Sequence, residues 1–396
     1  MATKEAKVQV ELHAEELKEF LIHIVNNNRA LQAKGAVPVC VNIEGEAGIG
    51  KTSAVEQLAK ELGLDICRIN LAQIEELGDL VGFPLKEYEV TNGTNYMWVT
   101  ENSIPQHITN GYNPTGERRM SHAAPEFIQG RTKGGILLLD DYTRADARFM
   151  QATMTLIETQ QYMSWKLPPD WHIILTTNPD DGNYSVTALD PAQKTRFASV
   201  RFKFNVEVWA RWAEKVGVDS RCINFLLLHP EVITRDVNPR SVMTFFNSIS
   251  SIPDFDAQLG LIQMIGEGSV GPNFATMFTL FINNKLDKLT SPRDMLLHEN
   301  EAYIVGELRN SIGRGDKFRA DIASTLATRL INYTINYTEN HPVTDDMSKR
   351  LIRFCTDPEI FSNDIMYLLV KKIYNANTQK FQKMMTNAEV MKMSVK

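Results

Sequence analysis

The chain has 396 residues, which is enough for two or three domains. Hydrophobic residues make up 43% of the chain and charged residues 23%, as in ordinary globular proteins. The net charge of −6 argues against a protein that coats duplex DNA.

Three further features predict a cytoplasmic protein without a membrane span. No apolar run approaches the ~20 residues of a membrane-spanning helix. The N-terminal segment carries acidic side chains where a signal peptide needs an apolar block. The cysteines are scattered without a C-x-x-C pair, which is typical of reduced, buried thiols: Cys40, Cys67, Cys222 and Cys355.

Residues 8–34 are predicted to form one helix within an N-terminal segment, 1–35. Apolar side chains recur there at helical spacing, and Gly35 would end the helix.

The next stretch indicates a strand, a glycine-rich turn and a helix. Residues 37–43 are β-branched and almost uncharged, which is typical of a buried strand. Residues 53–62 repeat apolar side chains at helical spacing, and Gly63 offers a C-cap. The residues between them match the pattern G-x-x-x-x-G-K-[ST].

The residue types in this turn suit a phosphate chain. Glycines let backbone N–H groups point inward at a helix N-terminus, where the helix dipole also favours an anion. Lysine adds a full positive charge, and threonine adds a hydroxyl suited to Mg²⁺. The predicted phosphate-binding residues are Gly45, Glu46, Ala47, Gly48, Ile49, Gly50, Lys51 and Thr52.

From residue 36 to about 205, strand-like runs alternate with helical patterns. This alternation predicts a parallel sheet sandwiched by helices. The expected strands are 37–43, 64–70, 135–140, 172–177 and 200–204.

Residues 86–134 are polar, rich in turn residues and long, so we expect a functional or disordered loop there. Tyr96, Met97 and Trp98 form an apolar cluster within it. They either pack the loop onto the domain or contact a partner. Residues 160–171 are predicted to form a hairpin.

Polar residues follow two of the expected strands. Asp140 and Asp141 end the apolar run "GGILLLDDYTRA", so they would lie at the sheet edge beside the phosphate loop. One carboxylate can hold Mg²⁺, and the other can orient and deprotonate a water. Asn178 ends the strand in "WHIILTTNP", where its amide can hold a water or a phosphate oxygen.

Two arginines follow these strands along the chain. Arg196, in "ALDPAQKTRF", can reach a phosphate, most naturally one in a neighbouring subunit. Arg240, in "VNPRSV", begins a helix in a second, mostly helical region that runs from about 207 to 396. Each of these residues has an equally good structural explanation when it is taken singly. Asn178 could be a turn residue, Arg196 a surface residue and Arg240 a residue at the start of a helix.

The ordered series resembles the AAA+ ATPases, and within them the MoxR-like, dynein-related branch. The likeness covers roughly residues 36–250. The matching stretches are "GEAGIGKT" as Walker A, "ILLLDDYTRA" as Walker B, "ILTTNP" as sensor 1, "LDPAQKTRF" as the arginine-finger segment and "NPRSV" as sensor 2.

The resemblance implies an α/β P-loop NTPase domain over 36–205, an all-α lid over 206–285 and a helical C-terminal extension over 286–396. It also implies ATP and Mg²⁺ as cofactors. Lys51 would bind the β- and γ-phosphates, and Thr52 and Asp140 would bind the metal.

The remaining implied roles concern hydrolysis. Asp141 would polarise the attacking water and Asn178 would help to place it. Arg196 would act across a subunit boundary, Arg240 would report the nucleotide state to the lid, and Arg144 would line the same boundary. The family usually has Glu where this chain has Asp141, so the reach to the water is one methylene shorter.

The resemblance implies a ring oligomer, a hexamer, in which ATP hydrolysis remodels or matures a protein client, often one with a VWA-type domain. Two alternatives stay open. One is a nucleic-acid-dependent NTPase or translocase of the restriction or helicase kind, with a basic channel from 116–120 and 129–135. The other is a nucleotide-gated assembly scaffold with little turnover.

Overall fold

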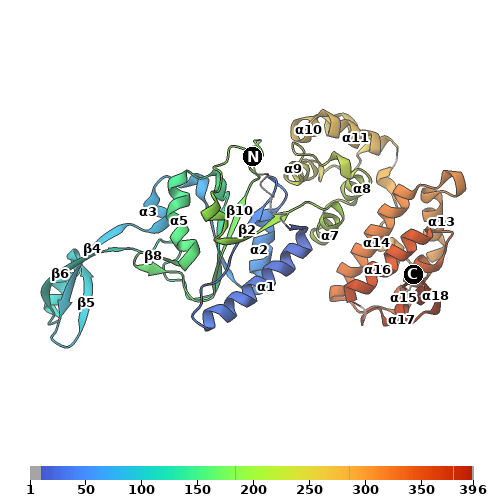
Figure 1. Cartoon of the computed structure of the whole chain (residues 1–396). Helices are drawn as coiled ribbons and strands as arrows, with labels where there is room; N and C mark the ends of the chain where they lie inside the picture. Colours follow the sequence, from blue (N-terminus) through green and yellow to red (C-terminus); the bar gives the residue numbers. More distant parts are fainter. Residues whose placement is uncertain (1–9, 183, 285, 378, 395–396) are drawn as a thin grey trace, which may run out of the picture. The chain divides into compact units, whose positions relative to one another are not determined.

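The structure is a computed structural model, and it describes residues 10–182, 184–284, 286–377 and 379–394. The chain divides between Lys203 and Phe204 into two compact units (Figure 1). The first unit is α/β. The second is helical throughout the residues that the structure describes.

A six-stranded sheet in which every pairing is parallel forms the centre of the first unit. The strand order is β1-β11-β2-β10-β7-β3. The predicted parallel α/β sheet is therefore confirmed, with each expected strand present within a few residues. The strands are β1 (Glu11–Leu12), β2 (Cys40–Glu44), β3 (Asp65–Asn70), β7 (Gly135–Asp140), β10 (Trp171–Thr177) and β11 (Phe197–Phe202).

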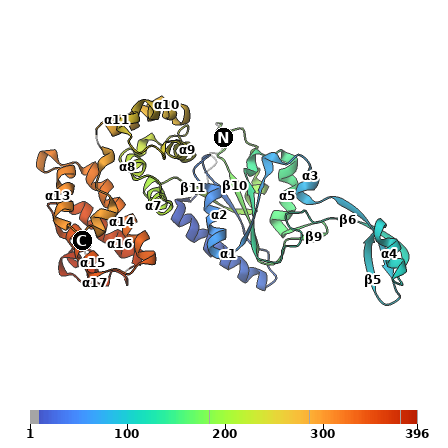
Figure 2. The same ribbon diagram turned by 180° about the vertical axis from the view of Figure 1, so that it is seen from behind.

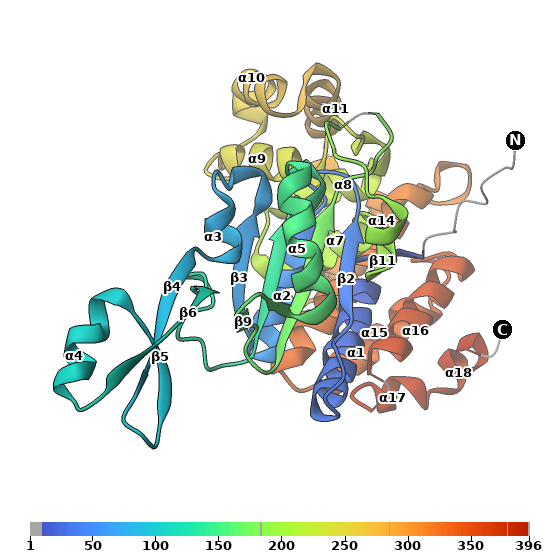
Figure 3. The same ribbon diagram turned by 60° about the vertical axis from the view of Figure 1, so that its left-hand side comes forward.

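Helices cover both faces of this sheet, because alternate residues of a strand point to opposite faces and both sets are apolar here. One face packs against α1 (Ala14–Ala33) and α2 (Lys51–Leu62). The other face packs against α3 (Leu77–Val81) and α5 (Ala147–Thr159). Figure 2 shows α1 and α2 on their side of the sheet, and Figure 3 shows α5 crossing the strands on the other.

The N-terminal helix begins later than the sequence pattern predicts. Helix α1 starts after His13, whose side chain forms a reciprocal capping box with Glu16. Glu11 and Leu12 pair instead with β11 and extend the main sheet by one short strand. The predicted helix over 8–34 is therefore wrong at its start, and residues 8 and 9 lie outside the described part of the chain.

The loop predicted over 86–134 is also wrong, because its residues up to 122 contain the strands of a three-stranded antiparallel sheet in the order β5-β4-β6. Asn92 explains the first hairpin: its side-chain oxygen accepts hydrogen bonds from the backbone N–H groups of Thr94 and Asn95 and closes the turn. The elements are β4 (Pro84–Thr91), β5 (Tyr96–Thr100), α4 (Ile104–Thr109) and β6 (Asn113–His122), seen at the left of Figure 1.

The apolar cluster at Tyr96, Met97 and Trp98 belongs to strand β5. The Arg119 guanidinium lies over the Trp98 ring, 4.5 Å from its centroid. Tyr96 remains exposed.

The hairpin predicted over 160–171 is confirmed as β8 (Gln161–Tyr162) and β9 (Trp165–Lys166). Met163 adopts a left-handed conformation in the turn, with φ of 47°. The Ser164 hydroxyl donates to the His122 carbonyl at 2.9 Å and so joins the hairpin to β6.

A polar cluster ties α1 to the start of β10. The Arg29 guanidinium donates to both carboxylate oxygens of Asp170, at 2.8 and 3.1 Å. His172 is buried, with Nε2 3.1 Å from the Asp170 carboxylate and Nδ1 3.5 Å from the Asn28 amide nitrogen. Burial lowers the pKa of His172 and outweighs the opposing effect of Asp170. Burial raises the pKa of Asp170, but the hydrogen bond and charge of Arg29, together with His172, hold it below its usual value.

This cluster predicts a loss of stability in mild acid. Both groups have lower pKa values in the folded protein, so the unfolded chain binds more protons. Their stabilisation is complete above pH 6.5, the ordinary value for histidine, and it decreases as the pH falls through that value and later through 3.8, that of Asp. We expect the urea midpoint to fall from pH 7 to pH 5, and to fall less steeply for His172→Gln. An equal fall of the urea midpoint with pH in the wild type and in His172→Gln would contradict this. The control is His23→Gln, which removes an exposed histidine.

The second unit consists of helices in its described residues, as the sequence predicts for 207–396. None of the described helices combines the length and apolar character that crossing a bilayer requires. The helices are α7 (Val206–Val216), α8 (Ser220–Leu228), α9 (Pro239–Ile249), α10 (Leu259–Val270), α11 (Pro272–Asn283), α12 (Pro292–Leu297), α13 (Glu301–Ile312), α14 (Ala320–Asn340), α15 (Asp345–Thr356), α16 (Asn363–Asn377), α17 (Gln382–Met385) and α18 (Ala388–Ser394).

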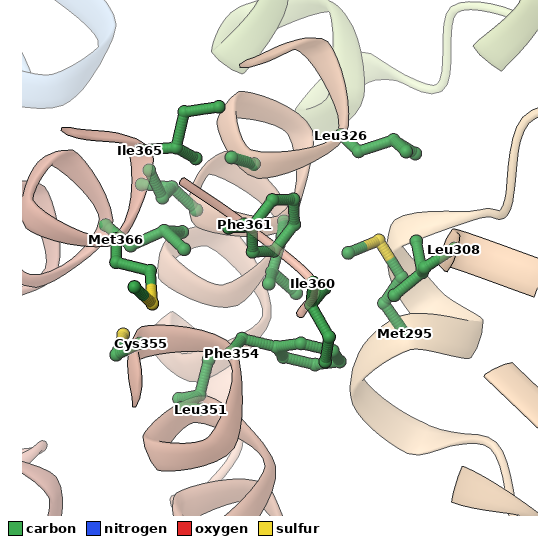
Figure 4. Packing of buried hydrophobic residues seen from close by; sticks show 14 of the residues in the cluster. Met295, Leu308, Leu326, Leu351, Phe354, Cys355, Ile360, Phe361, Ile365 and Met366 are labelled. Atoms are coloured by element: carbon green, nitrogen blue, oxygen red, sulfur yellow. The ribbon is translucent and has the colours of Figure 1, made fainter. Parts of the chain in front are cut away.

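Two apolar cores fill this unit. Aromatic rings from α8, α9 and α11 meet in one core, where Phe278 lies 4.9 Å from Phe225 and 5.1 Å from Phe245 between ring centroids. The other core lies among α12 to α18, and Figure 4 shows Phe354 and Phe361 packed within it. The cysteines of both units are free and buried, as predicted.

A buried arginine joins the first helices of this unit to α14. Arg329 donates from Nε to the Glu214 carboxylate on α7 at 2.9 Å, and from Nη1 to the Asn224 side-chain oxygen on α8 at 2.8 Å. The Arg329 side chain is 2% exposed and that of Glu214 12% exposed. A helix from the start of the unit and one from its middle therefore share a buried ion pair.

Candidate functional site

The glycine-rich turn lies between β2 and α2, at the carboxyl end of the parallel sheet. Its N–H at Gly45 donates to the carbonyl of Thr177, the last residue of β10, at 3.1 Å. A Cβ at Gly45 would lie 2.7 Å from the Phe202 carbonyl oxygen, so this position needs glycine. Gly50 caps α2 with φ of 101°, a conformation that other residues rarely adopt. The strand, turn and helix thus form a P-loop.

Lys51 is folded back into this loop. Its ammonium donates to the carbonyl oxygens of Gly45 at 2.7 Å and Glu46 at 2.9 Å, and to the side-chain oxygen of Asn178 at 3.0 Å. The residue is 7% exposed. Backbone and amide oxygens hold the charge here, and phosphate oxygens can take their place because they are stronger acceptors for an ammonium group.

Asp140 and Thr52 meet at the other side of the loop. The Thr52 hydroxyl donates to Asp140 Oδ1 at 2.9 Å, and the Thr176 hydroxyl donates to the same oxygen. Thr176 in turn accepts the backbone N–H of Asp141 at 3.0 Å, so β10 fixes the positions of both acidic residues. A hydroxyl and a carboxylate are ligands that Mg²⁺ accepts together with phosphate oxygens and water, so the residues present fit this metal.

Asp141 and Asn178 lie next to each other beyond this pair. The Asn178 amide nitrogen lies 3.4 Å from the Asp141 carboxylate, while its oxygen accepts from Lys51. Asp141 has φ of 51°, a strained conformation for a residue with a side chain, and such strain often occurs at functional sites. Arg144 lies 3.8 Å from the Asp141 carboxylate.

The structure therefore brings together five of the predicted site residues from three segments of the chain: Lys51, Thr52, Asp140, Asp141 and Asn178. Gly48 has φ of 74° within the turn, and Ile49 packs against the core beneath it.

Two predicted residues lie outside this cluster. In the described part of the chain, the Arg196 side chain bonds to the Glu158 carboxylate at 3.1 Å and to the Ala192 carbonyl, and to none of the five clustered residues. Arg240 lies in the second unit, exposed on the first turn of α9.

Two further residues join the site without having been predicted. The Arg68 guanidinium, from β3, donates to Asp140 Oδ2 at 2.8 Å from Nε and lies 2.7 Å from it through Nη2. The Tyr184 hydroxyl donates to the Glu46 carboxylate at 2.6 Å and accepts the backbone N–H of Ala47 at 3.3 Å. Neither residue belongs to a spacing pattern. The only signal for Arg68 is its place near the end of a predicted strand of the same sheet.

Comparison with known proteins finds distant similarities. No protein-family model matches the chain. A stretch of 184 residues is 24% identical to Midasin of Giardia intestinalis, over 41% of this chain and 4% of the length of Midasin.

Solved structures with some likeness include RuvB of Thermotoga maritima. One RuvB variant superposes with a TM-score of 0.37 at 13% identity, over 76% of this chain and 82% of that one. Another RuvB structure, described as a Holliday junction branch migration motor, has a TM-score of 0.30 at 14% identity, over 89% of this chain and 86% of that one. The parallel strand order and the glycine-rich turn between β2 and α2 identify the first unit as a P-loop α/β fold.

Proposed function

We propose that this protein is a Mg²⁺-dependent ATPase of the AAA+ class, from its MoxR-like, dynein-related branch. The observation that carries the proposal is the meeting of Lys51, Thr52, Asp140, Asp141 and Asn178 at the carboxyl end of one parallel sheet. Ligands of open α/β sheets bind at this edge. The order of the Walker, sensor and arginine-finger motifs along the chain supports the branch.

In this proposal the P-loop binds the triphosphate. Residues 45–52 wrap the triphosphate at the N-terminus of α2, where backbone N–H groups of the turn and the helix dipole favour phosphate oxygens. Lys51 exchanges its carbonyl partners for the β- and γ-phosphates. Thr52 and Asp140 would hold Mg²⁺, which would supply positive charge beside the phosphate oxygens.

Hydrolysis then depends on Asp141 and Asn178. Asp141 accepts a hydrogen bond from the attacking water and takes up its proton as the water oxygen bonds to the γ-phosphorus. The bond from that phosphorus to the β-γ bridging oxygen breaks, and ADP leaves with the electron pair. Asn178 holds that water in line without adding charge. The 3.4 Å separation of the two side chains is compatible with one shared water.

The proposal includes assembly. Arg196 lies between α6 (Pro191–Lys194) and β11, half-buried and apart from the P-loop cluster of its own chain. We therefore assign it to the site of a neighbouring subunit in a hexameric ring. Arg240 reports the nucleotide state to the helical second unit. Hydrolysis drives remodelling or maturation of a protein client, such as one with a VWA-type domain.

The test of nucleotide binding is Lys51→Ala. The variant loses charge-assisted hydrogen bonds worth about 1.5–3 kcal/mol, so its affinity for Mg-ATP should fall roughly 10- to 100-fold. Isothermal titration with a slowly hydrolysed ATP analogue measures this.

Lys60→Ala is the matched control, because Lys60 is exposed at the other end of the same helix. An affinity of Lys51→Ala equal to that of the wild type, with both proteins folded by circular dichroism, would refute the proposed site.

A further inference from the structure

Arg68 is the one basic side chain recorded in contact with the Asp140 carboxylate in the described part of the chain. Two of its nitrogens lie 2.8 and 2.7 Å from Asp140 Oδ2, and its third lies 3.6 Å from the Glu56 carboxylate on α2. The Arg68 side chain is 48% exposed, whereas that of Asp140 is 5% exposed. A half-exposed guanidinium therefore covers one oxygen of a buried carboxylate.

Both oxygens of Asp140 already have donors. Oδ1 accepts the hydroxyls of Thr52 and Thr176, and Oδ2 accepts Arg68. A buried carboxylate without such partners is costly, which explains why a positive group lies there. A divalent cation that binds Asp140 meets this positive charge at close range and is repelled by it.

We propose that Arg68 is a positioning residue that acts as the counter-ion of Asp140 in the metal-free protein and sets the Mg²⁺ concentration that the site requires. This inference rests on the proposed function. When Mg²⁺ is bound, the attraction between Arg68 and Asp140 weakens, and Glu56 receives the guanidinium. Glu56 already lies 3.6 Å from Arg68, and both side chains are about half exposed, so the guanidinium can shift toward Glu56 without leaving water.

Magnesium dependence of nucleotide binding tests this without turnover. A fluorescent, slowly hydrolysed ATP analogue is bound to the full chain while Mg²⁺ is titrated, and anisotropy gives the Mg²⁺ concentration at half-maximal tightening. Arg68→Gln keeps a donor but loses the charge, so this concentration should fall about tenfold. Arg68→Lys should stay near the wild type because it keeps the charge. Glu56→Gln should raise the concentration, because the arginine loses its alternative partner.

Arg148→Gln is the matched control, since it removes an exposed arginine from the start of α5. An unchanged or raised Mg²⁺ requirement in Arg68→Gln would overturn the inference. If Arg68→Gln fails to fold, the Arg68→Lys and Glu56→Gln variants decide the question. A Mg²⁺ requirement in Glu56→Gln equal to that of the wild type would then overturn the inference. A wild-type protein that binds no analogue at any Mg²⁺ concentration would instead refute the proposed function.

Discussion

Arg196→Ala should lower the ATPase rate by about 10³-fold or more while it leaves nucleotide affinity unchanged, because an arginine finger contributes 10³–10⁵ to turnover. In its own chain Arg196 bonds to Glu158 and Ala192, and its side chain is 27% exposed. The guanidinium is thus held at the surface by one partly exposed carboxylate, an interaction weak enough to exchange for a phosphate.

Mixed assemblies test whether Arg196 acts in trans. Arg196→Ala subunits keep a complete P-loop, and Lys51→Ala subunits keep a complete arginine. Each variant alone should be nearly inactive. Mixing them should restore part of the activity, because some sites then combine the intact P-loop of an Arg196→Ala subunit with the arginine of a Lys51→Ala subunit. Steady-state ATPase assays measure this.

Lack of recovery in mixtures that assemble, as checked by sedimentation, would contradict a shared site. Activity per subunit of the wild type that stays constant on dilution to monomer would contradict it as well. Arg148→Ala is the control for loss of a surface arginine, and it should retain wild-type turnover.

Arg329→Ala should destabilise the second unit by about 3–5 kcal/mol, the usual cost of removing one partner of a buried ion pair. The change leaves the Glu214 carboxylate 12% exposed and without its guanidinium, and it leaves the Asn224 oxygen without a donor. Chemical denaturation of the full chain, followed by circular dichroism, measures the loss.

Two variants sharpen this test. Arg319→Ala removes an exposed arginine paired with Asp321 and should cost no more than about 1 kcal/mol. The double variant Arg329→Met with Glu214→Leu should recover most of the stability, because well-packed apolar residues can replace a buried ion pair. A loss in Arg329→Ala no larger than that in Arg319→Ala would show that the pair is not what holds α14 to α7.

Much of the first unit could be predicted because its local signals agree with its fold. The strands around Ile43, Leu138 and Ile174 are buried on both faces, so their sequences are apolar throughout and easy to recognise. The P-loop was predictable because φ at Gly50 and the close approach at Gly45 exclude other residues.

The small antiparallel sheet could not be predicted in the same way. Residues Asn113–Met120 of β6 are exposed on both faces, so no apolar alternation marks the strand. The strand is placed by backbone pairing with β4, whose hairpin with β5 is closed by the side chain of Asn92. Charge pairs at long sequence separation, such as Arg68 with Asp140 and Arg329 with Glu214, leave no periodic signal either.

The small sheet has a further consequence for how this protein can vary. The N–H of Ala123, after β6, donates to the carbonyl of Phe83, before β4, at 2.9 Å. The polypeptide therefore leaves the α/β core and rejoins it at adjacent points, so the two ends of the small sheet are joined across a single hydrogen bond. Insertions and deletions between these two points should therefore be tolerated without displacing the strands of the main sheet.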